Sequence, residues 1–571
     1  MKNRKLFWLL SLVLVLSAFL AACGGGGSDT STEPKEDTEK PAEGDAATGE
    51  LDATQELNLM DSAEIPSMDS AIAEDQVSFI VLNNVNEGLY RLNKDNLAEP
   101  AVASGEPEIS EDGLTYTFKL REDAKWSDGS PLTAKDFVFS WQRAIDPATG
   151  SPYGPYMMAG TIKNATEISE GKMDKAELGV KAVDDYTLEV QLERPTPYFL
   201  SLMSFGTFYP QSEAFVTEKG DAYASNSENI LYNGPFTLTE WDGTGLSWVY
   251  KKNPEYWDAE TVKLETINVD VVKETSTALN LYQTGEKDRT GLSSEYAMQY
   301  ADDPELIKQL NPSVFYLKFN QERGGKETPL ANVNIRKAIA TSFNKQDLTD
   351  VVLANGSLPA NGLVPTDFTF DENKGDFRDV NGDMLKYDVE AAKKYWETGL
   401  KELGVTELSL ELLGGDSELS KKMDEYMKAQ MEENLEGLSI TLKEVPFNVR
   451  LELDESQDYD IQFAGWGPDY QDPMTFVDLF VTGSSHNLMS YSNEKFDDLV
   501  AQAKGELATD AAGRWQAMAD AEKILIEEDA AIAPVYQQGQ MSLQKPYVHD
   551  IAQHPFGGDY SYKWAYISGK E

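Results

Sequence analysis

Runs of alternating apolar and polar residues follow runs of helical period along most of the chain. The clearest period-two stretches cover residues 114–120 and 186–192 and predict strands with one buried face. Helical patterns cover residues 133–144, 334–342, 389–403, 417–433 and 510–528. No Pro/Gly/Ser-rich linker interrupts the chain after residue 52. The pattern therefore predicts interleaved α/β lobes, between which the chain crosses more than once.

The chain begins with a different pattern. Basic residues open it, an apolar run covers residues 6–20, and Ala21 and Ala22 precede Cys23. This arrangement predicts a secretion signal over residues 1–22, too short and wrongly flanked for a durable spanning helix. Cys23 is the only cysteine among 571 residues, so neither an internal disulfide nor a cysteine-based metal site can form.

The Leu-Ala-Ala-Cys sequence at residues 20–23 resembles the bacterial lipoprotein box, which implies that Cys23 carries lipid. A chance cysteine after an ordinary signal peptide is the alternative. Residues 24–50 contain no Val, Ile, Leu, Met or aromatic residue, so they cannot bury enough apolar surface to become ordered. Cys23 and the residues up to 51 are therefore predicted to be a lipidated, disordered, acidic tether.

The net charge and the lack of catalytic motifs restrict the classes of function that the chain can have. The net charge of −49 excludes nucleic acid as a partner. We interpret the charge as a means of solubility outside the cell; a preference for cationic ligands is the alternative. The three histidines form no H-E-x-x-H motif, and neither a nucleophile elbow nor a phosphate loop occurs. We expect no enzyme activity, no metal and no cofactor; an extracellular hydrolase is the weaker alternative.

Several aromatic segments resemble one family. Residues 112–147 combine a strand, an Asp-Gly turn and a capped helix with an aromatic face. Further segments follow in order: Asn-Gly-Pro-Phe at 233–236, Asn-Pro-Glu-Tyr-Trp at 253–257, Asn-Val-Asn-Ile-Arg-Lys-Ala at 332–338, Gly-Trp-Gly-Pro-Asp-Tyr at 465–470 and Ala-Pro-Val-Tyr at 533–536. From residue 52 onward the chain resembles the extracytoplasmic solute-binding proteins of peptide ABC importers (family 5), and most closely the oligopeptide-binding lipoproteins.

The resemblance implies a two-lobed α/β fold of the periplasmic-binding-protein type (type II, large peptide-binding class) that closes on its ligand by hinge motion. It also implies an extra domain inserted in the first lobe. The expected boundaries are residues 52–92, 210–312 and 541–571 for lobe I, 93–209 for the inserted domain and 313–540 for lobe II.

The resemblance also assigns a binding site. Asp469 would pair with the free α-amino group of a peptide, although an Asp after Pro is also typical of a turn. Gly465, Trp466 and Gly467 would supply part of a main-chain ladder to the ligand. A second strand would come from Ser78, Phe79 and Ile80. Tyr156 would be a polar contact near the amine, or an aromatic residue that packs on the inserted domain.

At the other end of the ligand the chain departs from the family. Some members meet the peptide carboxylate with basic groups at three places, where this chain has Leu353 and its neighbours, Ser420 and Phe463. None of these is basic, although a slip in alignment would let Lys421 serve at one place. We therefore expect longer peptides, variable lengths or a protruding C-terminus, with a non-peptide cationic ligand or a metal complex as a smaller alternative.

The predicted function is that of a passive receptor. It would be a monomer, held by lipid on Cys23 at the outer face of the cell membrane of a Gram-positive type of bacterium. It would bind oligopeptides and deliver them to two permease subunits with cytoplasmic ATPases. A receptor lipoprotein for a peptide signal, of the pheromone type, is the alternative.

Overall fold

A computed structural model of the chain describes residues 50–196 and 198–570. The predicted secretion signal, Cys23 and nearly all of the predicted tether lie outside the described residues. No helix in the described ranges has both the length and the hydropathy needed to cross a bilayer. The described residues form one compact unit.

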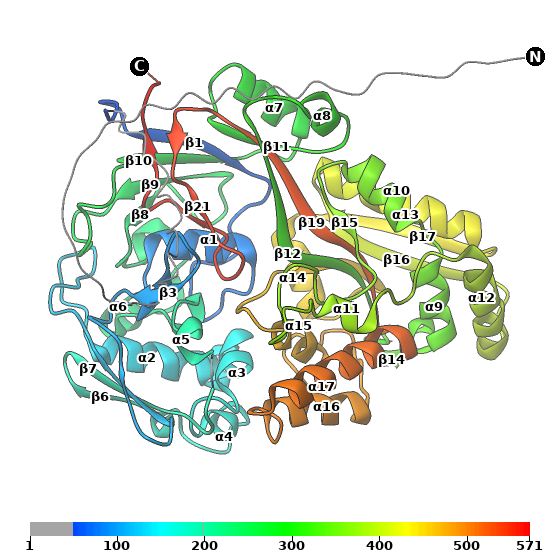
Figure 1. Cartoon of the computed structure of the whole chain (residues 1–571), viewed down its shortest axis with the longest axis horizontal. Helices are drawn as coiled ribbons and strands as arrows, with labels where there is room; N and C mark the ends of the chain where they lie inside the picture. The colour runs from blue at the N-terminus through cyan, green and yellow to red at the C-terminus, as the bar shows by residue number, and fades with distance from the viewer. Residues whose placement is uncertain (1–49, 197, 571) are drawn as a thin grey trace, which may run out of the picture. The chain divides into compact units, whose positions relative to one another are not determined.

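The first sheet has four strands in the order β1-β10-β9-β8 (Figure 1). β1 pairs in parallel with β10, and the other pairs are antiparallel. Apolar residues of period two fill the buried face; Leu57, Ile267 and Trp248 are examples. Its strands are β1 (Glu56–Asp61), β8 (Phe236–Thr239), β9 (Ser247–Lys252) and β10 (Thr266–Val271).

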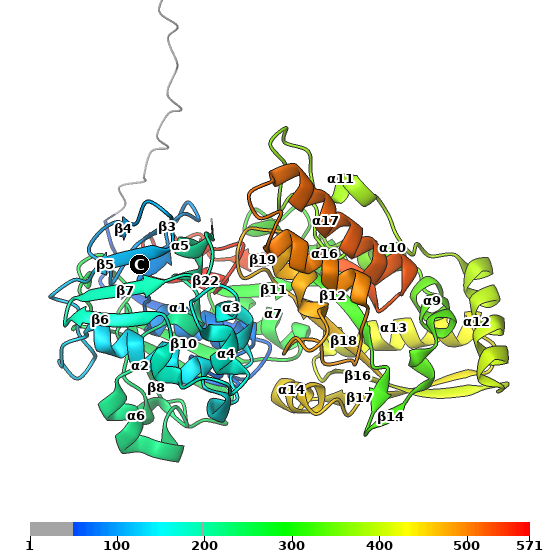
Figure 2. The ribbon, with the colours of Figure 1, turned by 90° about the horizontal axis from the view of Figure 1, so that it is seen from below.

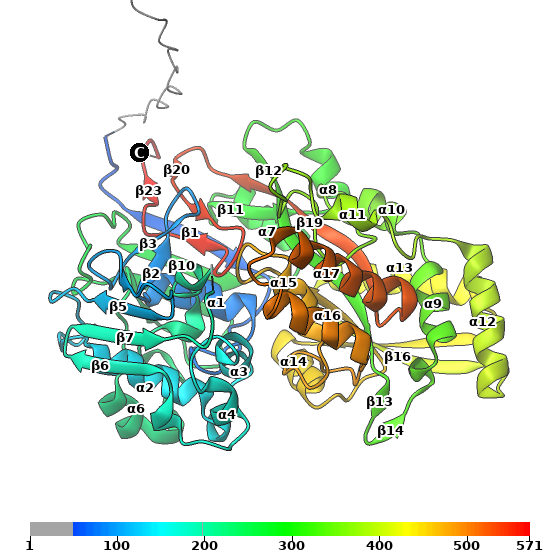
Figure 3. The ribbon, with the colours of Figure 1, turned by 60° about the horizontal axis from the view of Figure 1, so that its bottom comes forward.

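A second four-stranded sheet is antiparallel throughout, in the order β4-β5-β7-β6. It contains both predicted period-two strands, each one residue shorter at both ends, and buries Phe118 and Val190. Its strands are β4 (Glu108–Ile109), β5 (Thr115–Lys119), β6 (Val180–Asp184) and β7 (Thr187–Gln191). Helix α2 (Ala134–Ile145) lies beside it (Figure 3) and begins at a capping box, in which Thr133 N donates to Asp136 Oδ2 at 2.7 Å.

The largest sheet has seven strands, with β11-β19-β12-β18-β16-β17 in order and β15 paired with β19. Its two long strands, β12 and β19, pair antiparallel, with irregularities in register near Leu310 and Phe315. In Figure 1 both run from the neighbourhood of β11 to that of β16. The strands are β11 (Arg289–Leu292), β12 (Leu306–Phe319), β15 (Leu358–Pro359), β16 (Leu408–Gly415), β17 (Leu438–Val445), β18 (Ile461–Trp466) and β19 (Ile532–Gln544).

The predicted helices are present. Ser417 and Asp510 cap α13 and α17 by accepting main-chain N–H groups, as short polar side chains do at helix starts. After α17 the chain continues as a π-helix, η9 (Ile524–Glu528), which completes the predicted stretch 510–528. Figure 2 shows α16 beside α17, and α9 beside α12. These helices are α9 (Val333–Thr341), α12 (Val389–Leu403), α13 (Glu418–Asn434), α16 (Glu494–Lys504) and α17 (Ala511–Lys523).

The remaining elements are short. The other helices are α1 (Gln76–Val85), α3 (Tyr153–Met158), α4 (Ala165–Ser169), α5 (Phe199–Leu202), α6 (Glu213–Lys219), α7 (Thr275–Gln283), α8 (Ser294–Gln299), α10 (Lys345–Asp347), α11 (Arg378–Asn381), α14 (Phe447–Glu455) and α15 (Met474–Val477). Paired short strands are β2 (Tyr90–Leu92) with β3 (Ala98–Pro100), β13 (Glu322–Arg323) with β14 (Lys326–Glu327), β20 (Val548–His549) with β23 (Tyr566–Ile567), and β21 (Ala552–Gln553) with β22 (Tyr560–Ser561).

The apolar core does not stop at the predicted lobe borders. One cluster of buried side chains includes Leu57, Phe118, Tyr316 and Ile526, which come from all three predicted domains. Likewise, β12 and β19 each run through a predicted border, at 312/313 and 540/541 respectively. The chain therefore crosses between the lobes within continuous strands, and the residue at which each domain ends stays a prediction.

Gly539 of β19 offers a test of the packing around the long strands. A Cβ atom there would lie 2.0 Å from the carbonyl carbon of Gly356, whereas a Cβ at Gly291 of β11, in the same sheet, meets nothing within 4 Å. We expect Gly539→Ala to destabilise the protein by about 1–3 kcal/mol, because main-chain atoms must move. Gly291→Ala should change stability by less than about 0.5 kcal/mol. Urea unfolding measures both, and equal effects would contradict this packing.

Candidate ligand-binding site

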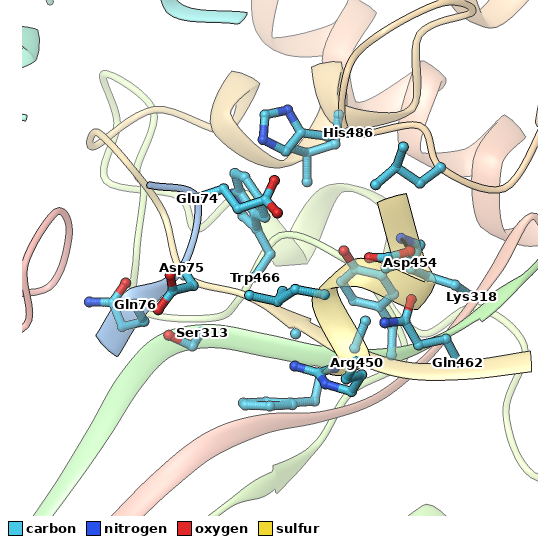
Figure 4. A pocket seen from close by; sticks show the side chains of 18 of the residues that line it. Glu74, Asp75, Gln76, Ser313, Lys318, Arg450, Asp454, Gln462, Trp466 and His486 are labelled. Atoms are coloured by element: carbon cyan, nitrogen blue, oxygen red, sulfur yellow. Dashed lines mark hydrogen bonds and ion pairs between the residues drawn. The ribbon is translucent and has the colours of Figure 1, made fainter. Parts of the chain in front are cut away.

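A cavity of about 320 Å³ lies between the start of α1, strands β12 and β18, and helix α14 (Figure 4). Its lining is rich in carboxyl groups, which come from Glu74, Asp75, Asp454, Asp469 and Asp559. Lys318 and Arg450 supply the cationic groups of the lining. The cavity therefore has more acidic than basic groups, as the whole chain has.

One edge of strand β18 is open beside this cavity. The strand pairs with β12 along its full length, but with β16 only at Ile461 and Gln462. Residues 464–466 therefore have no partner strand on that side within the described part of the chain. A Cβ at Gly465 would lie 2.7 Å from the ring of Phe315, so only glycine lets the main chain lie this close to β12. The predicted ladder residues Gly465, Trp466 and Gly467 all line the cavity.

Asp469 is buried at the cavity wall. Tyr153 donates its hydroxyl to Asp469 Oδ1 at 3.2 Å, and Thr475 Oγ1 accepts from the main-chain N–H of Asp469 at 3.0 Å. Burial raises the pKa of the Asp469 carboxyl well above its ordinary value, and the negative charge of Asp478 raises it further. No cationic side chain in the described ranges pairs with it. The site is thus a buried carboxyl that lacks a countercharge.

Aromatic rings pack together around Tyr153, whose hydroxyl donates to Asp469. The rings of Tyr153 and Trp466 are parallel within 6°, with centroids 6.1 Å apart. His486 packs edge-on against both, at 4.9 and 5.0 Å. Burial lowers the pKa of His486 to about 3, so this ring is neutral near pH 7. The electron-rich faces of such rings favour a cation nearby.

The hydroxyl of Tyr156 contacts another carboxylate, and its predicted place near the ligand amine stays a prediction. Its hydroxyl donates to Asp478 Oδ1 at 2.9 Å and to the Thr475 carbonyl at 3.4 Å. The tyrosine that reaches Asp469 is Tyr153, which the sequence analysis missed. Both lie in the Ser-Pro-Tyr-Gly-Pro-Tyr segment, where spacing alone does not say which hydroxyl faces the carboxylate.

The prediction that Ser78, Phe79 and Ile80 form a strand is wrong. They lie in helix α1, because Asp75 caps it: Oδ1 accepts the Ser78 N–H at 2.8 Å, and Oδ2 accepts the Ser78 hydroxyl at 2.5 Å. The main-chain groups of the helix serve its own hydrogen bonds. Of the three residues, only Phe79 lines the cavity. An Asp before an apolar run is an N-cap signal that could have revealed the helix.

The structure supplies no basic group at the three places where the family resemblance put contacts to the peptide carboxylate. Leu353 and Phe463 are buried, and neither lines the cavity. Ser420 bonds to Ser417, and Lys421 lies 3.9 Å from Glu444. The basic residues that do line the cavity are Lys318 and Arg450, neither of which the sequence analysis singled out. No group of three or more His, Cys, Asp or Glu residues in the described part could hold a metal ion.

Polar contacts also link the predicted domains. Lys273, which follows β10, binds Asp416 at 2.8 Å and Glu64 at 3.3 Å. The Thr275 N–H donates to Glu418 at 3.0 Å. Elsewhere, the Ser485 hydroxyl donates to the Pro152 carbonyl at 2.7 Å. In the arrangement described, the predicted lobes are therefore in direct contact.

Glu74 makes the stability of the folded protein dependent on pH. Burial, together with the negative charges of Asp454, Asp75 and Glu455, raises the pKa of Glu74 from 4.5 to about 7. A carboxyl with a raised pKa stabilises the fold fully below its ordinary pKa, and that stability is lost as the pH rises through 7. Glu74→Gln should therefore raise the melting temperature relative to the wild type at pH 8, and this gain should vanish near pH 4.5.

Thermal unfolding from pH 4.5 to 8 measures this difference. Glu425→Gln, on the exposed face of α13, removes a charge far from the cavity and is the control. A Glu74→Gln effect of the same size at every pH would contradict the assignment.

Residues 98–487 match the family model described as bacterial extracellular solute-binding proteins, family 5 Middle. The dipeptide-binding protein of Lactococcus lactis subsp. cremoris is 33% identical, over 99% of this chain and 100% of that protein.

Two solved structures are also similar. The structure of Listeria monocytogenes OppA bound to peptide has a TM-score of 0.88 and 52% identity, and the match covers 91% of this chain and all of that one. The structure of the pheromone receptor PrgZ has a TM-score of 0.85 and 39% identity, with coverage of 90% of this chain and all of that one.

Proposed function

Since the chain belongs to the bacterial extracellular solute-binding proteins of family 5, we propose that it captures oligopeptides in the described cavity and delivers them to an ABC importer. The predicted fold class, a two-lobed α/β binding-protein fold with an extra domain, is confirmed by the similarity to solved family members. The observation that carries the proposal is the buried Asp469 carboxyl, without a countercharge, next to an open strand edge.

Asp469 would bind the α-amino group of the peptide. An ammonium beside it would supply the missing countercharge and lower the pKa of the carboxyl, so that both groups are charged in the complex. Tyr153 holds one carboxylate oxygen, and Trp466 lines the same cavity. Desolvating an unpaired ammonium would cost several kcal/mol, which makes this carboxylate a strong determinant of affinity.

The peptide main chain would add to the open edge of β18 at residues 464–466. Main-chain hydrogen bonds are common to all peptides, so they contribute affinity without reading the side chains. Gly465 lets the main chain of β18 lie against the Phe315 ring, because a Cβ there would lie 2.7 Å from that ring. The N-terminal end of α1, with Glu74, Asp75 and Gln76, faces the cavity where a second strand was expected.

Ligand binding would favour the closed arrangement. The contacts of Lys273 with Asp416 and of Ser485 with Pro152 join the predicted lobes, and a ligand that touches both lobes adds to them. A monomer in this form would be recognised by the two permease subunits, whose ATPases drive import. We propose that the protein itself does no catalysis and uses no cofactor.

A receptor for a signalling peptide is the second candidate, favoured by the likeness to the pheromone receptor PrgZ. The same cavity would serve both roles, because import and signalling differ only after the peptide has bound. A non-peptide cationic ligand would also satisfy Asp469 and the aromatic rings, but it would leave the strand edge unused.

The amine contact can be tested by a double-mutant cycle. Asp469→Ala should weaken the binding of a peptide with a free amine by about 2–5 kcal/mol, because the ammonium loses its partner charge. N-acetylation of the peptide should have a similar effect on the wild type. The two changes together should cost little more than either alone, since both remove one interaction. Isothermal titration calorimetry measures all four corners, and simple additivity would contradict the pairing.

We further propose that residues 1–22 are removed and that Cys23 carries lipid. The support is the Leu-Ala-Ala-Cys sequence and the polar tether that follows it. Two or more acyl chains would give stable anchoring, which one chain alone does not.

Cys23→Ser should therefore release the protein from the cells into the medium, whereas Ser28→Ala in the tether should leave it in the membrane fraction. Immunoblots of both fractions from a bacterial host measure this. Retention of the Cys23→Ser variant in the membrane would rule out the lipid as the anchor.

A further inference from the structure

Arg450 lies on α14, lines the cavity, and donates one N–H to the Phe463 carbonyl at 2.8 Å. No carboxylate in the described ranges comes within ion-pair distance of it. By contrast, four other arginines with little exposed surface each pair with a carboxylate: Arg91 with Glu87, Arg143 with Asp69, Arg378 with Glu522, and Arg514 with Asp472. Arg336 is a buried arginine without a carboxylate partner in the described part of the chain, but its donors bind the main-chain carbonyls of Leu330, Ala331, Asp529 and Ala530. Arg450 has no such set of carbonyls.

The nearest acidic groups do not neutralise Arg450. Asp454 binds Lys318 at 2.5 Å, and Asp75 is occupied as the cap of α1. Asp424 on α13 has no hydrogen-bond partner, and burial raises its pKa to about 8, so it is largely uncharged near pH 7. Burial lowers the pKa of the Arg450 guanidinium, which is the sign of a positive charge that lacks a partner.

The guanidinium remains open to the cavity. It has five N–H donors in a planar fork that fits a carboxylate, and one of them serves the Phe463 carbonyl. None of its nitrogens is a buried atom without a partner, so the remaining donors are accessible from the cavity side. Figure 4 shows Arg450 among the labelled side chains of the cavity.

Arg450 and Asp469 mark the two ends of the open edge of β18. Arg450 holds the carbonyl of Phe463, where pairing with β16 has just ended, and Asp469 lies beyond Trp466. The three open residues between them span about 10 Å at the rise of an extended strand. A short extended peptide has opposite charges at its ends over a similar distance.

We propose that Arg450 binds the α-carboxylate of a short peptide, of roughly three or four residues at the extended rise, whose amine is held by Asp469. This inference rests on the proposed peptide-binding function and adds a specificity for length. It replaces the expectation that the carboxyl end is not held, because the basic group comes from a position outside the three that the family resemblance suggested. Peptides of other lengths would bind through Asp469 and the strand edge alone.

The test uses alanine-based peptides of two to eight residues, each as the free acid and as the C-terminal amide. For the wild type, amidation should weaken the binding of peptides of three or four residues by at least about tenfold and should have little effect on the longest. Arg450→Gln should lower affinity for the short free acid to that of its amide and leave the affinity for the amide unchanged. Lys401→Gln, on the exposed face of α12, removes the same charge elsewhere and should change neither.

Several outcomes would overturn the inference. One is wild-type binding that is insensitive to amidation at every length. Another is an Arg450→Gln variant that weakens free acid and amide equally, which indicates a purely structural role. A third is an amidated short peptide whose binding is fully restored by a glutamate side chain, which would make a side-chain carboxylate the ligand of Arg450.

If the melting temperature shows that Arg450→Gln does not fold, the amidation series on the wild type tests the inference by itself. Failure of the proposed function looks different, because then no peptide binds at any length with either terminus.

Discussion

The antiparallel ladder between β12 and β19 is the interaction on which the rest of the structure depends. These two strands, of 14 and 13 residues, lie at the centre of the largest sheet, and both pass through the predicted borders between the lobes. β18 pairs with β12, so the position of the open edge beside the cavity is set by this ladder. Irregularities in register near Leu310 and Phe315 interrupt the regular hydrogen bonding where the strands pass between the predicted lobes.

The cavity holds two ionisable groups that have no oppositely charged partner within the described part of the chain. Asp469 has hydroxyl and main-chain contacts but no cation, and Arg450 has a carbonyl but no carboxylate. A buried charge without a partner costs free energy, and a ligand that supplies the opposite charge recovers it. A peptide with free termini carries both opposite charges, and its main chain fits the strand edge between them. The groups that bind the charged termini thus select peptides as a class. The strand edge binds the main chain and does not distinguish the side chains.

Local patterns predicted most of the elements correctly. Strands at 114–120 and 186–192 and helices at 133–144, 389–403 and 417–433 occur within a residue or two of their predicted ends. They succeed because burial of one face imposes a period of two or 3.6 on the sequence itself. Ser78, Phe79 and Ile80 were assigned by resemblance rather than by pattern, and there the cap formed by Asp75 gave a helix instead.

The sequence by itself determined the elements, the family and the importance of the Gly-Trp-Gly-Pro-Asp-Tyr segment, because each is encoded in neighbouring residues. The tertiary structure alone decided that Tyr153 rather than Tyr156 contacts Asp469, and that Arg450 lines the cavity. Tyr153 and Asp469 are 316 positions apart in the chain. Spacing within a motif cannot say which of two hydroxyls meets a carboxylate from another lobe. The sequence around an arginine gives no sign that its partner is missing until every element around it is in place.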